Sequence, residues 1–414
     1  MAEYQPSQAL DKGEVRSILD ALAREGAQQM LISALERELE EFLGRARYER
    51  VPEGRKRGYR NGLGRRRKVA VGCGTLEVRP PRLRDTVEPF TSQILPKYQR
   101  ASAAVRALLP ELYLQGLATG DFEPALRSLL GEAAPLSPAS IVRLKAQWQQ
   151  EYEAWRTRPL TEHLYAYLYA DGLYLKAGPV DEHLAVLIVI GVREDGSKEL
   201  LAMVEGYRES MESWREVLRD LKHRGVREIR LVIGDGALGL WAAVRAVYPE
   251  ARHQYCWCHK MLNVLDKLPD RLQPDARGAL RDVYAAPTRE EAKTRIAAFA
   301  ERFGAEYPRA VASLTAHQEE LLTYYDFPQA HWRSLRSTNP IESIFDQVRL
   351  RTNATRRMRT AQTGLHLVFQ LVHQAQTRWH KIEGAHLVSK VLQGVRFVNG
   401  IEEMKKSTKR GVAA

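Results

Sequence analysis

A single carboxylate interrupts the apolar stretch 168–176, which reads Leu-Tyr-Ala-Asp-Gly-Leu-Tyr-Leu-Lys. The pattern predicts a buried strand, in which an unpaired, ionised Asp171 would be costly. A divalent cation would convert that carboxylate into a ligand. An aspartate that ends the strand and forms a turn with Gly172 is the structural alternative. Two further acidic residues, Asp235 and Glu342, favour the metal site, because the elements that carry them can meet Asp171.

Those elements follow a recognisable order. The pattern predicts strands at 165–176, 183–192 and 199–204, a helix at 213–223, a strand at 228–234, a helix at 238–247 and a strand at 253–257. Three strands followed by helix, strand, helix and strand predict an α/β fold with a ribonuclease-H-like core. In such a sheet the first and fourth strands are neighbours, so Asp171 and Asp235 would meet at one edge.

The third carboxylate comes from a helix that begins at Asn339-Pro340, with Glu342 in its first turn. Three carboxylates would hold two Mg²⁺ or Mn²⁺ ions about 3.5–4 Å apart, which act on the attacking and leaving oxygens of a phosphodiester. Further along this helix, Arg349 and Arg351 are candidates to bind phosphate. Asp346 could be the metal ligand instead, or Glu342 could simply favour the helix start. Spacing alone does not separate these alternatives.

No competing catalytic motif is present: the chain has no Gly-x-Ser-x-Gly, P-loop, His-Glu-x-x-His or Gly-x-Gly-x-x-Gly sequence. One cluster, His253, Cys256, Cys258 and His259, carries the atoms that bind zinc. Because no second cluster completes a chelate loop of normal spacing, we interpret it as a strand end whose histidine orients the carboxylates. Trp257 is predicted in the core, although it or Trp241 could stack on an unpaired base.

The charge balance indicates a polyanionic partner. The 414 residues include 63 Lys and Arg against 51 Asp and Glu, a net charge of +12. Nucleic acid is the first candidate and an anionic membrane surface the second. No apolar run approaches the roughly 20 residues of a membrane span, and the N-terminus has no signal pattern. Together with only three cysteines, this predicts a cytoplasmic protein in a reducing compartment.

Basic residues concentrate near the N-terminus. The stretch 10–48 has helical periodicity, and a dense basic block with interleaved glycines follows it. Residues 69–79 then predict two short strands about a turn. Between 101 and 155, short helices followed by a helix opening at Ser137-Pro138 resemble a helix-turn-helix, with an ordinary bundle as the alternative. The residues predicted to contact DNA here are Arg55, Lys56, Arg57, Tyr59, Arg60, Asn61, Arg65, Arg66, Arg67, Arg143 and Lys145.

The predicted organisation runs as follows: a helical region for possible dimerisation (1–50), a basic DNA-contact segment with short strands (51–100), a helix-turn-helix-like domain (101–158), the first part of the core (159–258), a helical insertion (259–336), the helix of Glu342 with the closing helix (337–385), and a C-terminal tail (386–414).

Several motifs together carry a resemblance to a known family. They are Gly58-Tyr-Arg-Asn-Gly62, Tyr169-Ala-Asp-Gly172, Gly234-Asp-Gly236, Cys256-x-x-His259 with Asn263, and Ser337-Thr-Asn-Pro-Ile-Glu-Ser343. In this order they resemble the Mutator-like transposases of bacterial insertion sequences, over nearly the whole chain. The chain departs from the family pattern at Tyr255 and Leu262, where basic residues are common, and this affects only local DNA binding.

The resemblance implies a DDE transposase with Asp171, Asp235 and Glu342 as its catalytic and metal-binding triad, so that Glu342 rather than Asp346 is the ligand. It implies that Cys256 and His259 support the active site. The substrates would be double-stranded DNA, both terminal inverted repeats and target DNA, handled by a homodimer in the bacterial cytoplasm at the nucleoid. A nuclease of the same fold without strand transfer and a non-catalytic DNA-binding regulator are the alternatives.

Overall fold

The computed structural model describes residues 12–50, 57–114, 122–130, 138–176, 183–206, 210–236, 238–354 and 361–403. The chain divides into two compact units, of which the first ends at Ala146 and the second begins at Gln147. Helix α4 (Pro138–Arg156) crosses this boundary. It begins at Pro138, as predicted, and the preceding Ser137 lies outside the described residues.

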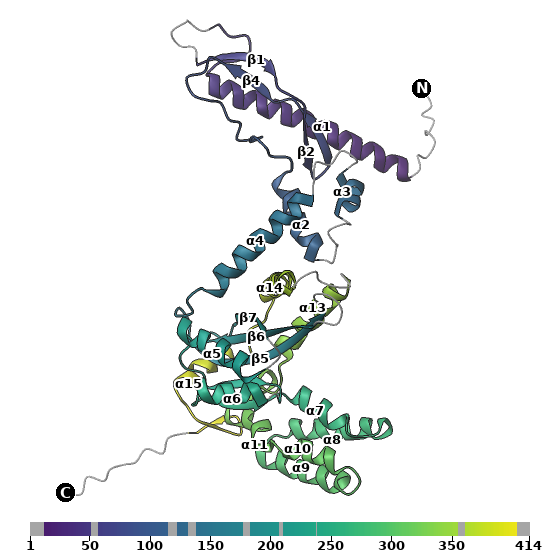
Figure 1. Ribbon diagram of the computed structural model, residues 1–414, viewed down its shortest axis with the longest axis vertical. Coiled ribbons are helices and arrows are strands. Elements are labelled where there is room, and N and C mark those ends of the chain that lie inside the picture. The colour runs from purple at the N-terminus through teal and green to yellow at the C-terminus, as the bar shows by residue number, and fades with distance from the viewer. Residues whose placement is uncertain are drawn as a thin grey trace, which may run out of the picture. The chain divides into compact units, whose positions relative to one another are not determined.

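The first unit combines one long helix with short strands. Its elements are α1 (Lys12–Leu43), β1 (Tyr59–Leu63), β2 (Arg67–Val71), β3 (Gly74–Val78), β4 (Pro81–Arg84), α2 (Ala103–Leu114) and α3 (Phe122–Leu130). The predicted N-terminal helix is a single continuous one, and β2 and β3 form the predicted hairpin. The antiparallel pairing of β1 with β4 was not predicted (Figure 1). Apolar side chains of α1 and of the hairpin share a core that comprises Leu35, Val69, Leu76, Val78 and Leu95.

The second unit is built on a mixed five-stranded sheet. The strands are β5 (Tyr165–Lys176), β6 (His183–Arg193), β7 (Lys198–Gly206), β8 (Leu231–Gly234) and β9 (Arg252–Tyr255), in the order β7-β6-β5-β8-β9. The first three strands pair antiparallel, whereas β5, β8 and β9 are parallel. The predicted α/β class and the predicted adjacency of the first and fourth strands are therefore confirmed.

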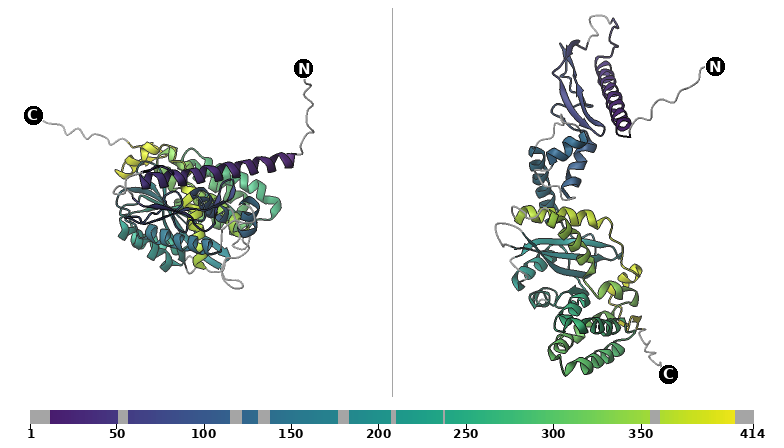
Figure 2. Two further views of the ribbon diagram at one scale, coloured as in Figure 1. Left: turned by 90° about the horizontal axis from the view of Figure 1, so that it is seen from above. Right: turned by 90° about the vertical axis from the view of Figure 1, so that its right-hand side faces the viewer.

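Helices cover both faces of this sheet. Two of them, α5 (Met211–Arg224) and α6 (Leu238–Val247), pack on each other, and α5 also packs against β7. On the other face, α14 (Ala361–Gln376) packs against β7 and β6 (Figures 1 and 2). The strand β5 is almost entirely buried between these layers because its neighbours β6 and β8 occupy both of its edges. The one acidic residue of β5, Asp171, is therefore buried.

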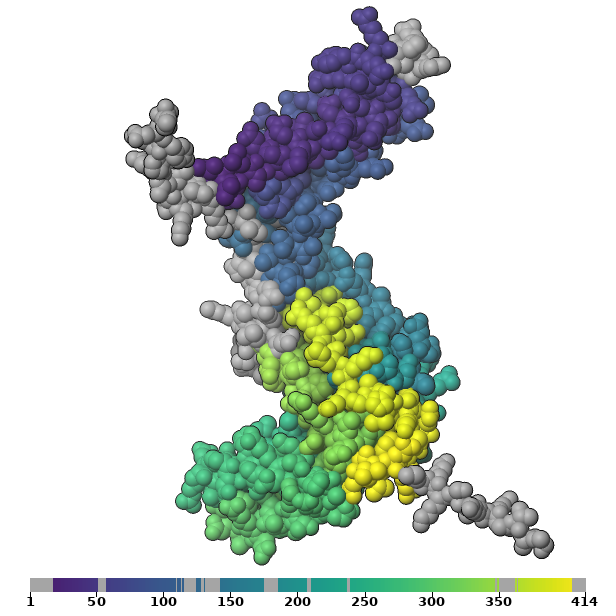
Figure 3. All heavy atoms as spheres, turned by 180° about the vertical axis from the view of Figure 1, so that it is seen from behind, coloured from purple at the N-terminus to yellow at the C-terminus, as the bar shows by residue number. Residues whose placement is uncertain are grey.

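The chain between β9 and α13 (Asn339–Ala354) is helical, as predicted, and every residue of it is described. Its elements are α7 (Trp257–Leu265), η2 (Asp270–Leu272), α8 (Gln273–Ala285), α9 (Arg289–Gly304), α10 (Pro308–Thr315), α11 (Gln318–Leu321), η3 (Thr323–Asp326), η4 (Gln329–His331) and α12 (Trp332–Leu335). Figure 3 shows these helices gathered in one lobe of the second unit, coloured green.

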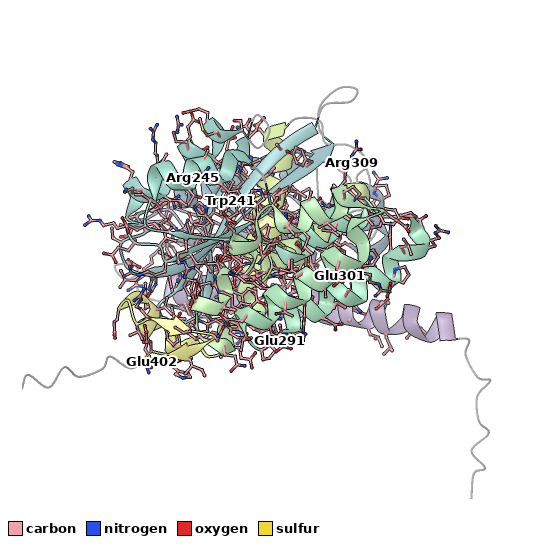
Figure 4. The ribbon with its side chains drawn as sticks, turned by 90° about the horizontal axis from the view of Figure 1, so that it is seen from below. Trp241, Arg245, Glu291, Glu301, Arg309 and Glu402 are labelled. Atoms are coloured by element: carbon pink, nitrogen blue, oxygen red, sulfur yellow. The ribbon has the colours of Figure 1, made fainter. Side chains whose placement is uncertain are left out.

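Ordered elements continue into the stretch that the sequence analysis treated as a tail. They are η5 (Ala385–Leu387), α15 (Val388–Leu392), β10 (Phe397–Val398) and β11 (Ile401–Glu402). The turn of the β10–β11 hairpin is bound to the second unit, because Gly400 donates to Tyr325 O at 3.0 Å and accepts from Gln329 N at 3.1 Å. Glu402, labelled in Figure 4, belongs to this hairpin. The basic tail 405–410 lies outside the described residues.

Candidate active site

Two aspartates follow paired positions on neighbouring strands. In the parallel register of β5 and β8, Ala170 lies opposite Gly234. Asp171 is the next residue on β5, where it also pairs with Ile188 of β6, and Asp235 directly follows the end of β8. The fold thus brings both carboxylates to the same edge of the parallel pair, as the sequence analysis predicted.

Asp171 is deeply buried, with 5% of its surface exposed. Its Oδ1 atom accepts a hydrogen bond from the Gly172 amide at 2.8 Å, whereas Oδ2 is buried with no hydrogen-bond partner among the described residues. Burial raises the pKa of Asp171 to about 7, against the opposing effect of His259; the nearby Asp235 raises it further. A buried carboxylate with one unpartnered oxygen and a second carboxylate nearby has the character of a cation ligand.

The loop that carries Asp235 is held by Trp241 of α6. The indole Nε1 donates to the Asp235 carbonyl oxygen at 3.0 Å, and the ring stacks on both His253 and Tyr255 of β9. Only 1% of Trp241 is exposed, and Figure 4 labels it on α6. Trp257 is buried too and donates to Leu321 O. Neither indole offers an open face, so base stacking by either residue is not supported.

Glu342 reaches the site from the first turn of α13, a helix that packs against β5. Thr338 begins this helix, because its carbonyl oxygen accepts from the amides of Ile341 and Glu342. The Thr338 hydroxyl also donates to Glu342 Oε1 at 2.9 Å. Burial and the Cys256 sulfur raise the pKa of Glu342. Thr338 is thus the residue that orients this carboxylate, a role that the sequence analysis missed.

Asp346, the alternative ligand, lies one turn further along α13. Its side chain is 80% exposed and approaches Arg349 at 3.9 Å. The side chain of Arg351 lies outside the described part of the structure. Of the two acidic residues on this helix, only Glu342 contacts the residues around Cys256.

Cys256 and His259 lie at a helix start rather than at a strand end, which corrects the predicted local structure. Strand β9 ends at Tyr255, Cys256 is the N-cap of α7, and His259 is in the first turn. The Cys256 amide donates to Gly234 O at 2.7 Å, which joins the start of α7 to the end of β8. The Cys-x-x-His sequence is therefore attached directly to the strand that delivers Asp235.

Cys256 and His259 form an electrostatically coupled pair beside Glu342. The interaction with the Cys256 sulfur raises the pKa of His259 to about 9, despite burial. Burial acts to raise the pKa of Cys256, but the interactions with its neighbours Cys258, His259 and Thr338 outweigh burial and lower this pKa well below the ordinary value. His259 Nδ1 also lies 3.8 Å from Glu342 Oε1, so the sulfur, the imidazole ring and the carboxylate are close neighbours.

The four residues that were considered as zinc ligands, His253, Cys256, Cys258 and His259, do not assemble into one site. His253 stacks on Trp241, and the Cys258 thiol donates to Asn339 Oδ1 at 3.3 Å. Instead, the ligand atoms of Cys256, His259 and Glu342 all lie within 4.8 Å of one another. The third member of this group comes from α13, far away in the sequence, and spacing gave no signal for it.

The predicted DNA-contact residues divide into exposed and internally bonded side chains. Arg67 donates to three carbonyl oxygens, those of Leu95, Pro96 and Gln99, and Arg60 pairs with two glutamates of α1. The guanidinium groups of these two arginines therefore make their contacts within the first unit. The exposed members of the set are Arg57, Tyr59, Asn61, Arg65, Arg66 and Arg143, with Lys145 partly buried; Arg55 and Lys56 lie outside the described residues.

Two basic residues that the sequence analysis did not select flank Tyr59. The guanidinium groups of Arg45 and Arg84 lie 5.7 and 5.9 Å from its ring centroid. Arg82 and Arg84 occupy alternate positions on β4 and share one side of that strand. The alternating arginines directly after Pro80-Pro81 were the feature of the sequence from which Arg84 could have been selected as a DNA-contact candidate.

Within the described ranges, no helix combines the length and apolar character that crossing a membrane requires.

Comparisons with known proteins agree over most of the chain. The family described as "Transposase, Mutator family" matches residues 2–382. The transposase for insertion sequence element IS6120 of Mycolicibacterium smegmatis is 46% identical over 293 residues, which cover 71% of this chain and 91% of that protein. The transposase for element IST2 of Acidithiobacillus ferrooxidans is 42% identical over 281 residues, 67% of this chain and 95% of that protein. The transposase for element IS256 in transposon Tn4001 of Staphylococcus aureus is 28% identical over 358 residues, 84% and 89% of the two chains.

Proposed function

The chain belongs to the Mutator family of transposases, and we propose that it is a DDE transposase whose triad is Asp171, Asp235 and Glu342. It would bind the terminal inverted repeats of an insertion sequence, cleave a DNA strand and join it to a target. The observation that carries this proposal is the pairing of Ala170 with Gly234, which delivers two aspartates to one edge, together with α13, which packs against β5 and carries Glu342 in its first turn.

The core of this enzyme would be ribonuclease-H-like. Three antiparallel strands continue into two parallel ones in the order β7-β6-β5-β8-β9, and the two aspartates lie on the first and after the fourth strand in sequence. Helices cover both faces, and the helical stretch between β9 and α13 would be the insertion that precedes the glutamate. These features support the proposed core.

The residues fit a divalent cation such as Mg²⁺ or Mn²⁺. The buried Asp171 Oδ2 atom has no hydrogen-bond partner among the described residues, and carboxylate oxygens are the donors that these ions prefer. When bound, two such ions supply charge neutralisation at the attacking and leaving oxygens of a phosphodiester. Asp171, Asp235 and Glu342 would hold them.

The protein side chains would position the reacting groups in two successive displacements. In the first, water attacks the phosphodiester at the element end and releases a 3′-hydroxyl; in the second, this hydroxyl attacks target DNA. Thr338 would hold Glu342 in place through its hydroxyl group. Cys256 and His259 would support the same carboxylate from α7, at 3.7 Å and 3.8 Å from Glu342 Oε1.

DNA binding would reside mainly in the first unit and in α4. Its exposed basic residues, among them Arg57, Arg65, Arg66 and Arg143, supply phosphate contacts, while Tyr59 with its two flanking arginines lies on β1. On α13, the exposed Arg349 would bind phosphate near the cleaved bond. A homodimer would handle the two element ends.

The test is strand transfer with a labelled duplex that carries the element's own terminal repeat, read from the DNA that flanks the gene. Wild type is compared with Glu342→Gln, with Mg²⁺ present or chelated. Asp346→Asn is the matched control, because it removes the other carboxylate of the same helix, one turn away and exposed. We expect Mg²⁺-dependent joined products in wild type and in Asp346→Asn, and none in Glu342→Gln.

Other outcomes select the alternatives. Cleavage without joined products would favour a nuclease of the same fold. Repeat binding without cleavage in any variant would leave a DNA-binding regulator and overturn the catalytic proposal. Loss of products in Asp346→Asn with activity retained in Glu342→Gln would exchange the roles of the two residues.

A further inference from the structure

We propose that Cys256, His259 and Glu342 form a binding site for a thiophilic transition metal ion, with Zn²⁺ as the physiological candidate. The site is distinct in its chemistry from the carboxylate site proposed for Mg²⁺, although it shares Glu342. The binding itself does not depend on the proposed function.

The distances in the site match those that zinc requires. With Zn–S near 2.3 Å, Zn–N near 2.0 Å and Zn–O about 2.0–2.2 Å, tetrahedral angles separate sulfur from oxygen by about 3.5–3.7 Å and nitrogen from oxygen by about 3.3–3.5 Å. Cys256 Sγ lies 3.7 Å from Glu342 Oε1, and His259 Nδ1 lies 3.8 Å from the same oxygen. Shifts of a few tenths of an ångström would complete three corners of a tetrahedron.

The ligand atoms are also held in place before an ion arrives. Cys256, only 1% exposed, is fixed at the N-cap of α7; its sulfur accepts from the Thr338 amide at 3.3 Å and lies 3.4 Å from the Thr338 hydroxyl oxygen. The same hydroxyl group orients Glu342. Because helix starts fix all three ligands, binding would order few additional groups.

His259 supplies the independent observation that points to a ligand. Its Nδ1 atom is buried and makes no hydrogen bond to any described residue, although Glu342 Oε1 lies only 3.8 Å away. A buried ring nitrogen without a hydrogen bond is rare in folded proteins, and metal coordination is one of the roles that accounts for it.

The identity of the donors selects the metal. A thiolate with an imidazole suits Zn²⁺ or Cu⁺ and is a poor environment for Mg²⁺, which prefers oxygen ligands. Three protein ligands leave the fourth position open, as in zinc sites that bind water or substrate rather than in closed structural sites. Zn²⁺ bound at this position would occupy Glu342, which the proposed Mg²⁺ site also requires. Under the proposed function, Zn²⁺ would therefore inhibit DNA cleavage.

The experiment measures metal binding to the reduced full-length chain without DNA. Zn²⁺ affinity is determined by competition with a chromophoric chelator, and Co²⁺ is used as a spectroscopic probe, because a cobalt–thiolate bond produces a charge-transfer band in the near ultraviolet. We expect one ion per chain, a band that is lost in Cys256→Ser, and affinity reduced about tenfold or more in His259→Ala and in Glu342→Gln.

Cys258→Ser is the matched control, since it removes a thiol two positions away that is bonded to Asn339. It should retain the band and the affinity, as should Cys73→Ser in the first unit. Circular dichroism of each variant verifies folding, and Glu342→Gln keeps the test valid if Cys256→Ser does not fold.

Two results would overturn the proposal. One is the absence of stoichiometric Zn²⁺ binding by the wild-type chain, and the other is a charge-transfer band that persists in Cys256→Ser. Because this assay needs no DNA, failure of the strand-transfer experiment leaves it standing. Conversely, a chain that transfers strands but binds no Zn²⁺ refutes only this inference.

Discussion

Ala170 on β5 lies opposite Gly234 on β8 in the parallel pairing of the two strands, and an aspartate follows each of them. A parallel register places the next residue of each chain at the same level of the sheet. Asp171 and Asp235 are therefore brought together by backbone hydrogen bonds, before either carboxylate contributes any interaction of its own. Changes in this register should affect the site more than changes in the surrounding surface.

Gly234→Ala tests this dependence. A Cβ atom at position 234 would lie 2.4 Å from Leu240 Cδ2 and 3.3 Å from Ala170 O. We expect a loss of about 1–3 kcal/mol in the free energy of unfolding, together with loss of cleavage, because the buried Leu240 side chain must shift and β8 must separate slightly from β5. Gly236→Ala is the control, since nothing lies within 4 Å of a Cβ atom there. Denaturant unfolding and DNA cleavage are measured for both; equal stability of the two variants would contradict the prediction.

Strands β5 and β6 could be predicted because their apolar runs are long, and the single charge that interrupts the first of them, Asp171, marked the site. What could not be predicted depends on contacts between distant segments. The residues alone left Glu342 and Asp346 as alternatives, since both lie on one helix; the two differ in that Glu342 meets Thr338 and Cys256.

Local periodicity also failed where short elements depend on tertiary partners. The β1 and β4 strands are only five and four residues long and pair across an intervening hairpin. The β10–β11 hairpin has two-residue strands and is held by bonds from Gly400 to Tyr325 and Gln329. Neither has enough residues to produce an alternating pattern of its own.

Thr338→Val should separate positioning from folding. Valine keeps the shape of threonine but removes the hydroxyl group that donates to Glu342 Oε1 at 2.9 Å. We expect cleavage to fall about tenfold, which corresponds to about 1.4 kcal/mol, and the Mg²⁺ concentration for half-maximal activity to rise. Thr338→Ser, which restores the donor, should recover both. The measurement is a Mg²⁺ titration of cleavage; an unchanged Mg²⁺ requirement in Thr338→Val would assign Thr338 a structural role only.

Arg66 and Arg67 are adjacent in sequence but should behave oppositely. Arg67 donates to three carbonyl oxygens, so Arg67→Ala should destabilise the first unit by about 1.5–3 kcal/mol. The side chain of Arg66 is 76% exposed, and its approach to Glu77 at 3.6 Å adds little stability. Arg66→Ala should leave unfolding unchanged, weaken DNA binding and reduce the slope of log affinity against log salt by about 0.9.

Unfolding curves and DNA titrations at several salt concentrations test this pair. An unchanged salt slope in Arg66→Ala would remove this residue from the proposed phosphate contacts. A stable Arg67→Ala protein would contradict the structural role of that guanidinium group.

The fully buried His331 should make stability depend on pH. Its ring nitrogens lie 2.7 Å from the Tyr167 hydroxyl oxygen and 3.0 Å from Gly384 O, and burial lowers its pKa below 6.5. Between pH 6.5 and the lower folded-state pKa, the unfolded chain binds more protons than the folded one. Stability should therefore decrease as the pH falls through this range, by at most about 1.4 kcal/mol per pH unit from this group.

His331→Gln should remove this part of the pH dependence, even though it lowers stability at every pH by breaking the contacts with Tyr167 and Gly384. The measurement is the free energy of unfolding from denaturant titrations between about pH 5 and pH 7, a range that brackets the ordinary histidine pKa. His380→Gln is the matched control, because His380 is exposed, and it should keep the wild-type slope. If His331→Gln also kept that slope, the protons taken up on unfolding would have to bind at other residues. The buried imidazole between Tyr167 and Gly384 would then not be the group that causes the pH dependence.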